Sequence, residues 1–324
     1  MSSHPDLKLC PVCSWDFKDG QYRTSPYPTE AEKSEKRPRW IAFCGNCGIG
    51  IANPLWEGDE LEDFYSKGGY WGHSKTEILL PKKYPVPYTL AVSRWKLIGP
   101  FFEKSGKPIS MLDIGAGHGF LGMVAAKTLG SHLSTYVCVE KDRTLRESLG
   151  KTWSVFFPRN NLRIVDHIGH VDGKFDCIIL SHLLEHVAHP KALLHAVSEK
   201  MAKFGFLFID VPNQDYLFKK DVFPHLLFFS NSSLQYLLES CGLTIKSIYC
   251  YGNDMDHSRM NFRNASKVRS LLIETMMRAS IIIPENLIFL FFNRYFETDK
   301  QNNNGIWIRA LCQDSHSEEE GVNP

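Results

Sequence analysis

The sequence predicts an α/β fold in which a mostly parallel, Rossmann-like sheet of seven strands follows a small cysteine-rich module. From residue 109 onward, short apolar segments alternate with helix-like segments, which is the pattern of βαβ units. Residues 1–55 instead hold two Cys-x-x-Cys pairs. We therefore predict four parts: the cysteine-rich module over 1–55, a bridge over 56–108, the α/β domain over 109–314, and a disordered tail over 315–324.

The strands of the α/β domain are predicted from apolar runs of strand length. They are ISMLDIG, TYVCVE, LRIVDHI, FDCIILSH, GFLFIDVP, LTIKSIYCYG and GIWIRALC. Apolar residues at helical spacing predict helices over 88–103, 120–129, 143–153, 191–201 and 232–241. Because GIWIRALC follows a turn-forming segment and a helical region, we expect it to enter the sheet antiparallel to the other strands.

Composition restricts the possible partners. The chain has 324 residues, 43% of them hydrophobic and 23% charged, and its net charge is +1. Such a balance provides no strong field to attract nucleic acid or an anionic membrane. The opening MSSHPDLKLC lacks the apolar run of a signal peptide, and the longest apolar stretch, 281–292, is too short and interrupted to span a bilayer. We expect a cytoplasmic protein without a transmembrane segment, and the oligomeric state stays open.

The two cysteine pairs predict a structural metal site. Cys10 and Cys13 are separated by two residues, as are Cys44 and Cys47, so that one tight turn in each pair can direct both sulfurs at the same ion. Four thiolates suit tetrahedral Zn²⁺ and leave no open coordination position. The module is therefore predicted to be a zinc ribbon, and the alternatives are a redox pair or unrelated cysteines.

A glycine-rich segment, MLDIGAGHGF, joins the first predicted strand to the first helix. Its glycines permit a sharp turn and let backbone N–H groups approach a ligand closely. Dinucleotide-binding loops look similar, but Asp113 stands two residues before Gly115, where a carboxylate can meet an ammonium group that a dinucleotide lacks. Glu140 ends the second strand, where an acid can bind the two hydroxyls of a ribose.

These segments resemble the class I S-adenosylmethionine-dependent methyltransferases. The matching pieces, over roughly 109–250, are LDIGAGHGF, VCVEKD, FDCIILSHLLEHVAHP and FLFIDVPN. The resemblance implies S-adenosylmethionine as methyl donor and places Asp166 beside its adenine. The residues it implies as donor contacts are Asp113, Gly115, Gly117, Gly119, Phe120, Glu140 and Ser181.

The opening CPVC…CGNCGIGIANP, followed by DFYSKGGYW, is similar to the zinc-binding methyltransferases of bacterial polysaccharide and natural-product pathways. We expect the chain to be without the additional C-terminal domain of the sugar C-methyltransferases in that group. The resemblance therefore implies a small-molecule acceptor, such as a sugar or nucleotide-linked sugar, but it leaves open whether oxygen, nitrogen or carbon is methylated.

Four residues are the candidates for chemistry at the acceptor: His182, Glu185, His186 and His225. Each follows a strand whose carboxyl end should border the ligand. Residues 182, 185 and 186 can share one face of a turn or short helix. His225 stands beside the apolar run LLFF, where we expect a neutral imidazole to act as general base. The alternatives are a purely structural role for this group and binding of a metal ion.

Three aromatic residues of the bridge, Tyr65, Tyr70 and Trp71, are expected either to close over the substrate or to pack between the two modules. Two other functions stay open. One is methylation of RNA or protein with the ribbon holding the substrate, against which the neutral charge speaks. The other is a non-catalytic scaffold that has kept the fold.

Overall fold

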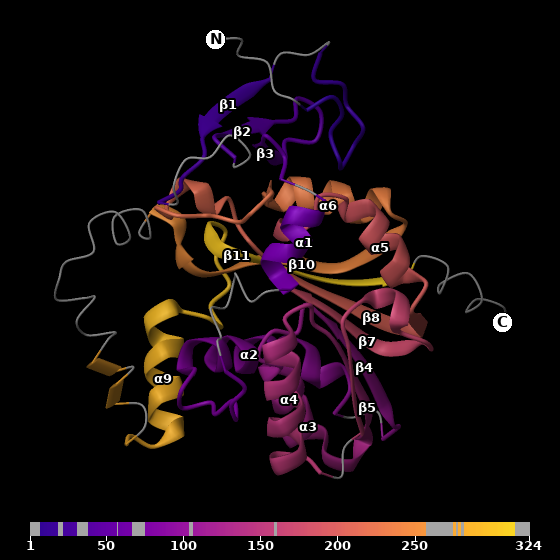
Figure 1. Cartoon of the computed structure of the whole chain (residues 1–324), viewed down its shortest axis with the longest axis vertical. Coiled ribbons are helices and arrows are strands. Elements are labelled where there is room, and N and C mark those ends of the chain that lie inside the picture. The colour runs from indigo at the N-terminus through magenta and orange to yellow at the C-terminus, as the bar shows by residue number, and fades with distance from the viewer. Residues whose placement is uncertain are drawn as a thin grey trace.

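The computed structural model describes residues 7–18, 22–30, 38–56, 58–66, 75–103, 106–158, 161–256, 275–276, 278–279 and 282–314. The predicted tail, 315–324, lies outside the described residues. Figure 1 shows a large α/β unit with a smaller β module packed on one side of it.

The large sheet has seven strands in the order β10-β11-β8-β7-β4-β5-β6. Its strands are β4 (Ile109–Ile114), β5 (Leu133–Val139), β6 (Asn161–Val165), β7 (Phe175–Ser181), β8 (Met201–Pro212), β10 (Leu243–Asp254) and β11 (Gly305–Asp314). The neighbours from β8 to β6 pair in parallel, whereas β11 pairs antiparallel with both β8 and β10. The predicted Rossmann-like sheet and its antiparallel last strand are confirmed.

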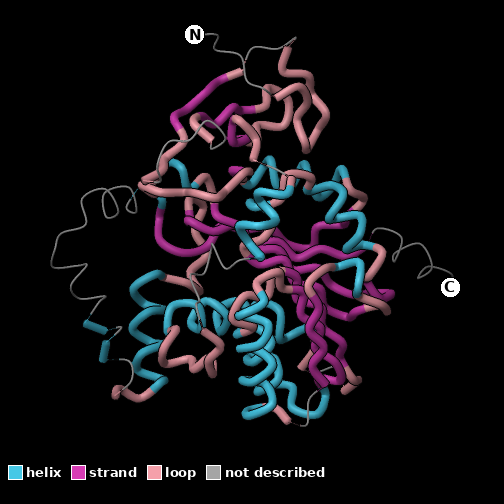
Figure 2. The backbone as a smooth tube through the Cα atoms, viewed as in Figure 1, coloured by secondary structure: helices cyan, strands magenta, loops and turns pink. Residues whose placement is uncertain are grey.

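Helices cover both faces of this sheet, as a parallel sheet with apolar strands requires. On one face the helices are α2 (Pro85–Ile98), α3 (Phe120–Leu129), α4 (Arg143–Phe156) and α9 (Glu285–Phe296). On the other face they are α5 (Pro190–Ser198) and α6 (Asn231–Ser240). Figure 2 shows the strands running between these two groups of helices.

The bounds of three predicted helices were wrong by more than one residue, among them the helix expected over 143–153, which extends to Phe156. The helix expected over 191–201 ends at Ser198, because the backbone N–H groups of Glu199 and Lys200 close its last turn and Met201 already pairs with Phe175 as the first residue of β8. The bridging helix begins at Pro85, earlier than expected, and ends at Ile98. Proline suits this first position because its missing N–H would have had no helical partner.

A second sheet contains four strands in the order β1-β2-β3-β9. These are β1 (Arg23–Pro26), β2 (Trp40–Phe43), β3 (Gly50–Asn53) and β9 (Leu227–Phe228). The first three belong to the cysteine-rich module, but β9 comes from the segment that follows β8. One cluster of buried apolar residues runs from the cysteines through β9 to the large sheet. The two modules therefore share both a strand and a hydrophobic core.

The remaining described elements are short. They are α1 (Asp59–Ser66), η1 (Gly99–Phe101), η2 (Gly130–His132), η3 (Ile168–His170), η4 (Leu184–His186) and η5 (Asp215–Leu217). Among the residues described, no helix has the length and apolar character needed to cross a membrane.

Candidate active site

A cavity of about 950 Å³ lies at the carboxyl ends of β4, β5 and β7. Ligands bind at this edge in open α/β sheets because the loops that leave the strands diverge there. Most of the residues predicted for the site line this cavity, namely Asp113, Gly115, Gly117, Phe120, Glu140, Asp166, Ser181, His182, His186 and His225. Gly119 and Glu185 do not line it.

The glycine loop makes the floor of the cavity. The three glycines of the loop, Gly115, Gly117 and Gly119, have positive φ angles between 53° and 73°. Residues other than glycine rarely adopt such angles. The N–H of Gly115 donates to the carbonyl of Val139, which ties the loop to β5. A Cβ on Gly119 would lie 2.5 Å from Cδ1 of Leu149, so this glycine is needed for packing against α4.

Two carboxyl groups border the loop. Asp113 is buried, and its Oδ2 accepts a hydrogen bond of 2.7 Å from the hydroxyl of Tyr136. Burial raises the pKa of Asp113 to about 6. Glu140 accepts bonds of 2.8 and 2.9 Å from the backbone N–H groups of Gly117 and Asp142, and burial raises its pKa as well. Backbone donors thus hold Glu140 at the cavity wall with its remaining lone pairs available.

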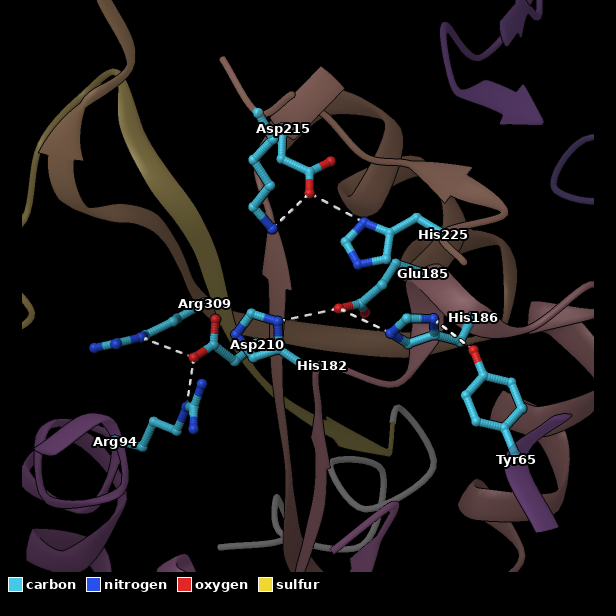
Figure 3. A network of polar contacts seen from close by, with 10 residues as sticks. Tyr65, Arg94, His182, Glu185, His186, Asp210, Asp215, His225 and Arg309 are labelled. Carbon is cyan, nitrogen blue, oxygen red and sulfur yellow. Dashed lines mark hydrogen bonds and ion pairs between the residues drawn. The ribbon is translucent and has the colours of Figure 1, made fainter. Parts of the chain in front are cut away.

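A buried cluster with an excess of positive charge adjoins these groups. Asp210 lies between two guanidinium groups, with Nε of Arg94 at 2.6 Å and Nε of Arg309 at 3.2 Å from its Oδ2 (Figure 3). Burial alone would raise the pKa of Asp210, but the two arginines bring it below its ordinary value. Arg94 lines the cavity, and its Nη2 is buried without a hydrogen-bond partner among the described residues. Two positive charges therefore face one negative charge, and Arg94 is the member of this cluster that lines the cavity.

The segment after β7 brings three predicted residues together. Nδ1 of His182 lies 3.1 Å, and Nε2 of His186 3.9 Å, from Oε1 of Glu185 (Figure 3). Burial favours the protonated form of Glu185, yet its hydrogen bond with His182 and the surrounding histidines leave its pKa below the ordinary value. Burial lowers the pKa of His186 to about 3, so this imidazole is neutral at physiological pH. The expectation that these residues share one face is met by the tight turn of η4.

His225 has a more polar environment than the sequence indicated. Its ring meets the His186 ring edge-on, with 4.7 Å between centroids. Its Nδ1 lies 3.0 Å from Oδ2 of Asp215, which also lies 2.9 Å from Nζ of Lys219. Burial would raise the pKa of Asp215, but His225 and Lys219 hold it well below the usual value. The prediction that His225 has apolar surroundings was therefore only partly right, because Asp215 contacts its ring.

Asp215 was missed from the sequence because no motif marks it. It is the first residue of η5, after β8 and ten residues before His225, and the distance between the two is set by the fold of that segment. Arg94 was missed for a different reason: it is one of two cations on α2, which precedes the sheet in the sequence, and only the packing of this helix brings it to the cavity.

Aromatic residues of the bridge take part both in lining the cavity and in packing between the two modules. The hydroxyl of Tyr65 lies 2.8 Å from Nδ1 of His186, and Tyr65 lines the cavity. Trp56 and Phe64 instead pack on Phe223, in the loop that carries His225. Tyr70 and Trp71 lie outside the described residues.

Asp166 lines the cavity and also contacts a histidine of η3. Its Oδ1 lies 2.8 Å from Nδ1 of His170, and both side chains are exposed. Ser181 ends β7 and lies at the cavity wall.

The four cysteines of the N-terminal module converge. Their sulfur atoms all lie within 4.8 Å of one another, with 3.7 Å between Cys10 and Cys47 and 3.4 Å between Cys13 and Cys44. Four sulfurs at about 2.3 Å from a tetrahedral Zn²⁺ would be about 3.8 Å apart, so the arrangement fits that ion. A second group of donor atoms, from Glu185, His186 and His225, also lies within 4.8 Å.

The sequence model of a family described as "Methyltransferase domain" matches residues 88–248. No curated protein matches the chain in sequence. The match spans the glycine loop, Glu140 and all four candidate residues of the acceptor side.

Solved structures with a similar chain path include three methyltransferases. Coclaurine N-methyltransferase bound to N-methylheliamine and SAH is 20% identical in sequence. The match covers 69% of this chain and 72% of that protein, with a TM-score of 0.45. The magnesium protoporphyrin IX methyltransferase of Synechocystis PCC 6803 with bound SAH is 14% identical, with coverage of 60% and 93% and a TM-score of 0.45. The plantazolicin methyltransferase in complex with SAH is 14% identical, with coverage of 71% and 85% and a TM-score of 0.45.

Proposed function

We propose, on the premise that residues 88–248 are a methyltransferase domain and the chain is a methyltransferase, that it transfers the methyl group of S-adenosylmethionine to a small-molecule acceptor. The observation that supports the proposal is one cavity lined both by Asp113, the glycine loop and Glu140 and by His182, His186 and His225. Its volume of about 950 Å³ is within the range of cavities that hold small ligands.

The charges at the loop wall complement the donor. S-adenosylmethionine carries an ammonium, a carboxylate and a ribose diol. Asp113 is assigned to the ammonium, Arg94 to the carboxylate and Glu140 to the ribose hydroxyls, while Gly115 and Gly117 let the ligand approach the backbone. Arg94 suits a carboxylate because its Nη2 is buried beside the cavity without a hydrogen-bond partner among the described residues.

The acceptor wall is assigned to His182, His186 and His225, with Glu185 beneath them. Bound S-adenosylmethionine supplies an activated methyl group on a positively charged sulfur. His225 takes the proton from the acceptor atom as that atom forms its bond to the methyl carbon, and the electrons of the old carbon–sulfur bond stay on sulfur. Asp215 stabilises the imidazolium that results and orients its ring. The cavity aligns the acceptor with the methyl group.

A metal ion at the acceptor wall is a second candidate, favoured by the convergence of Glu185, His186 and His225 within 4.8 Å. Two imidazoles and one carboxylate would suit an ion such as Zn²⁺, and they would leave a position open toward the cavity. Metal analysis separates the alternatives. A chain with only the cysteine site holds one ion, whereas a chain with both sites holds two and loses one in a His225→Ala variant.

The cysteine site is proposed to bind a structural Zn²⁺. Four sulfur ligands close the coordination sphere, so this ion would take no part in methyl transfer. Its proposed contribution is to fold the ribbon, because metal binding supplies much of the folding free energy of such modules.

Calorimetry with S-adenosylmethionine and S-adenosylhomocysteine tests the donor assignment, with NAD as the control ligand. Tight binding of NAD without a response to the other two would overturn it. Incubation of the protein with isotopically labelled S-adenosylmethionine and a small-molecule extract of the source cells then tests the reaction. Donor binding without any labelled product would favour a non-catalytic scaffold, and salt-sensitive binding of RNA would favour a nucleic-acid substrate.

A further inference from the structure

The N-terminal module holds the loop that carries His225 from both sides. Before His225, the N–H of Val222 donates to the carbonyl of Pro28 over 3.0 Å. After it, the N–H of Ala52 donates to the carbonyl of Leu226 over 2.8 Å, and β9 then pairs with β3. The candidate base therefore lies between two attachments to the ribbon.

Tyr27 is the side chain that reaches the residue itself. Its hydroxyl lies 2.9 Å from the backbone carbonyl oxygen of His225 and 3.3 Å from that of Val222. Its ring is buried and packs edge-on against Phe228 of β9, with 5.8 Å between centroids. Burial, together with the nearby carboxylates of Asp215 and Asp221, raises the pKa of Tyr27 far above its ordinary value, so the hydroxyl remains a donor.

The opposite side of this loop is attached to the catalytic domain. The N–H of Leu226 donates to the carbonyl of Glu185 over 2.6 Å, and Asp215 contacts the His225 ring. The His225 backbone is thus fixed between a ribbon tyrosine and the segment that carries the other acceptor-side residues. Because a displacement of about 1 Å can cost about 100-fold in rate, this attachment matters for proton transfer.

We propose that Tyr27 is a positioning residue that holds His225 in place for proton transfer, so that the ribbon forms part of the acceptor side of the active site. This inference rests on the proposed function, in which His225 is the base. It assigns the ribbon a role in catalytic geometry, which differs from a role in holding a macromolecular substrate.

A double-mutant cycle tests the proposal. Tyr27→Phe removes the hydroxyl and keeps the ring, and it is made both in the natural chain and in the His225→Ala variant. Turnover is measured with labelled S-adenosylmethionine and the small-molecule extract, beside donor affinity and melting temperature. The matched control is Tyr22→Phe, a ribbon tyrosine whose ring packs on Phe17 at 5.4 Å.

We expect Tyr27→Phe to lower turnover about 10-fold in the natural chain and less than about 2-fold in the His225→Ala background. The effects of two substitutions are not additive when one residue acts through the other. Donor affinity should stay unchanged, and Tyr22→Phe should have no effect on turnover in either background. Equal losses in both backgrounds, or no loss in the natural chain, would overturn the proposal.

A histidine spectrum gives a readout that needs no acceptor. With ¹⁵N-labelled histidine, the His225 ring signals are assigned by their absence from His225→Ala. We expect Tyr27→Phe to shift or broaden them and Tyr22→Phe to leave them in place; unshifted signals in Tyr27→Phe would contradict the proposal. Normal turnover in His225→Ala alone would instead show that the proposed base, and with it the need to position it, is wrong.

Discussion

Nδ1 of His225 lies 3.0 Å from Oδ2 of Asp215; both side chains are buried, and His225 lines the cavity. A carboxylate in this place holds the ring so that its other nitrogen is directed away from the acid. In the proposed mechanism it would also stabilise the imidazolium formed when His225 takes a proton.

Replacing the base should lower turnover without loss of the donor. We expect His225→Ala to reduce turnover about 100-fold or more, the usual scale for a general base. His225→Gln should be almost as poor, because it keeps polarity but cannot take the proton. Near-normal turnover in a well-folded His225→Ala protein, judged by its melting temperature, would end the base hypothesis.

Asp215→Asn isolates the orienting role. The amide keeps the size of the side chain but not its charge, so the imidazolium loses its stabilising partner. Turnover should fall about 10-fold or more while calorimetry gives an unchanged donor affinity. If instead turnover stays the same, Asp215 serves only to bind Lys219 and to pack the loop.

Donor affinity should depend on pH through Asp113. Its pKa of about 6 in the ligand-free protein means that the carboxylate is charged above pH 6 and protonated below it. A protonated Asp113 cannot pair with the donor ammonium, so we expect full affinity near pH 7 and about 10-fold weaker binding at pH 5. Calorimetry at the two pH values measures this change. The Asp113→Asn variant should bind weakly at both, and a natural chain without pH dependence would contradict the assignment.

Arg94→Met tests the site assigned to the donor carboxylate. Loss of a hydrogen bond to a charged group costs about 1.5–3 kcal/mol, so we expect donor affinity to fall at least about 10-fold. Decarboxylated S-adenosylmethionine is the matched control, since it lacks the group that Arg94 is proposed to bind and should bind both proteins alike. An equal loss for the two ligands would mean that the substitution acts through the Asp210 cluster.

The cysteine site should hold tightly bound zinc. We expect Cys44→Ser to lose the zinc of this site and to lower turnover far more than donor affinity, because the disturbed ribbon would release β9 and the His225 loop. Elemental analysis measures the zinc, the assay with labelled S-adenosylmethionine measures turnover, and calorimetry measures donor affinity. Cys241→Ser, a buried cysteine outside the cluster, should retain zinc. Metal-free natural protein that is fully folded would refute the site.

The sequence alone was enough for the architecture, because the relevant signals are local. Apolar runs of strand length alternate with helical spacing, and all seven predicted strands are present. The Cys-x-x-Cys spacing fixed which sulfurs could meet, since two residues allow only a tight turn. The residues predicted for the donor side meet at one cavity, because Asp113 and the glycines belong to one continuous segment and Glu140 directly follows β5.

Only the tertiary structure decided how the ribbon and the acceptor side are connected. The pairing of β3 with β9 joins residues about 180 positions apart, and no local pattern marks a two-residue strand. No motif in the neighbouring sequence marks Asp215, Arg94 or Tyr27 as residues of the site. Their positions follow from long-range packing, which is driven by the burial of apolar surface. The two modules form this surface together, so neither module shows it as a periodic pattern in its own sequence.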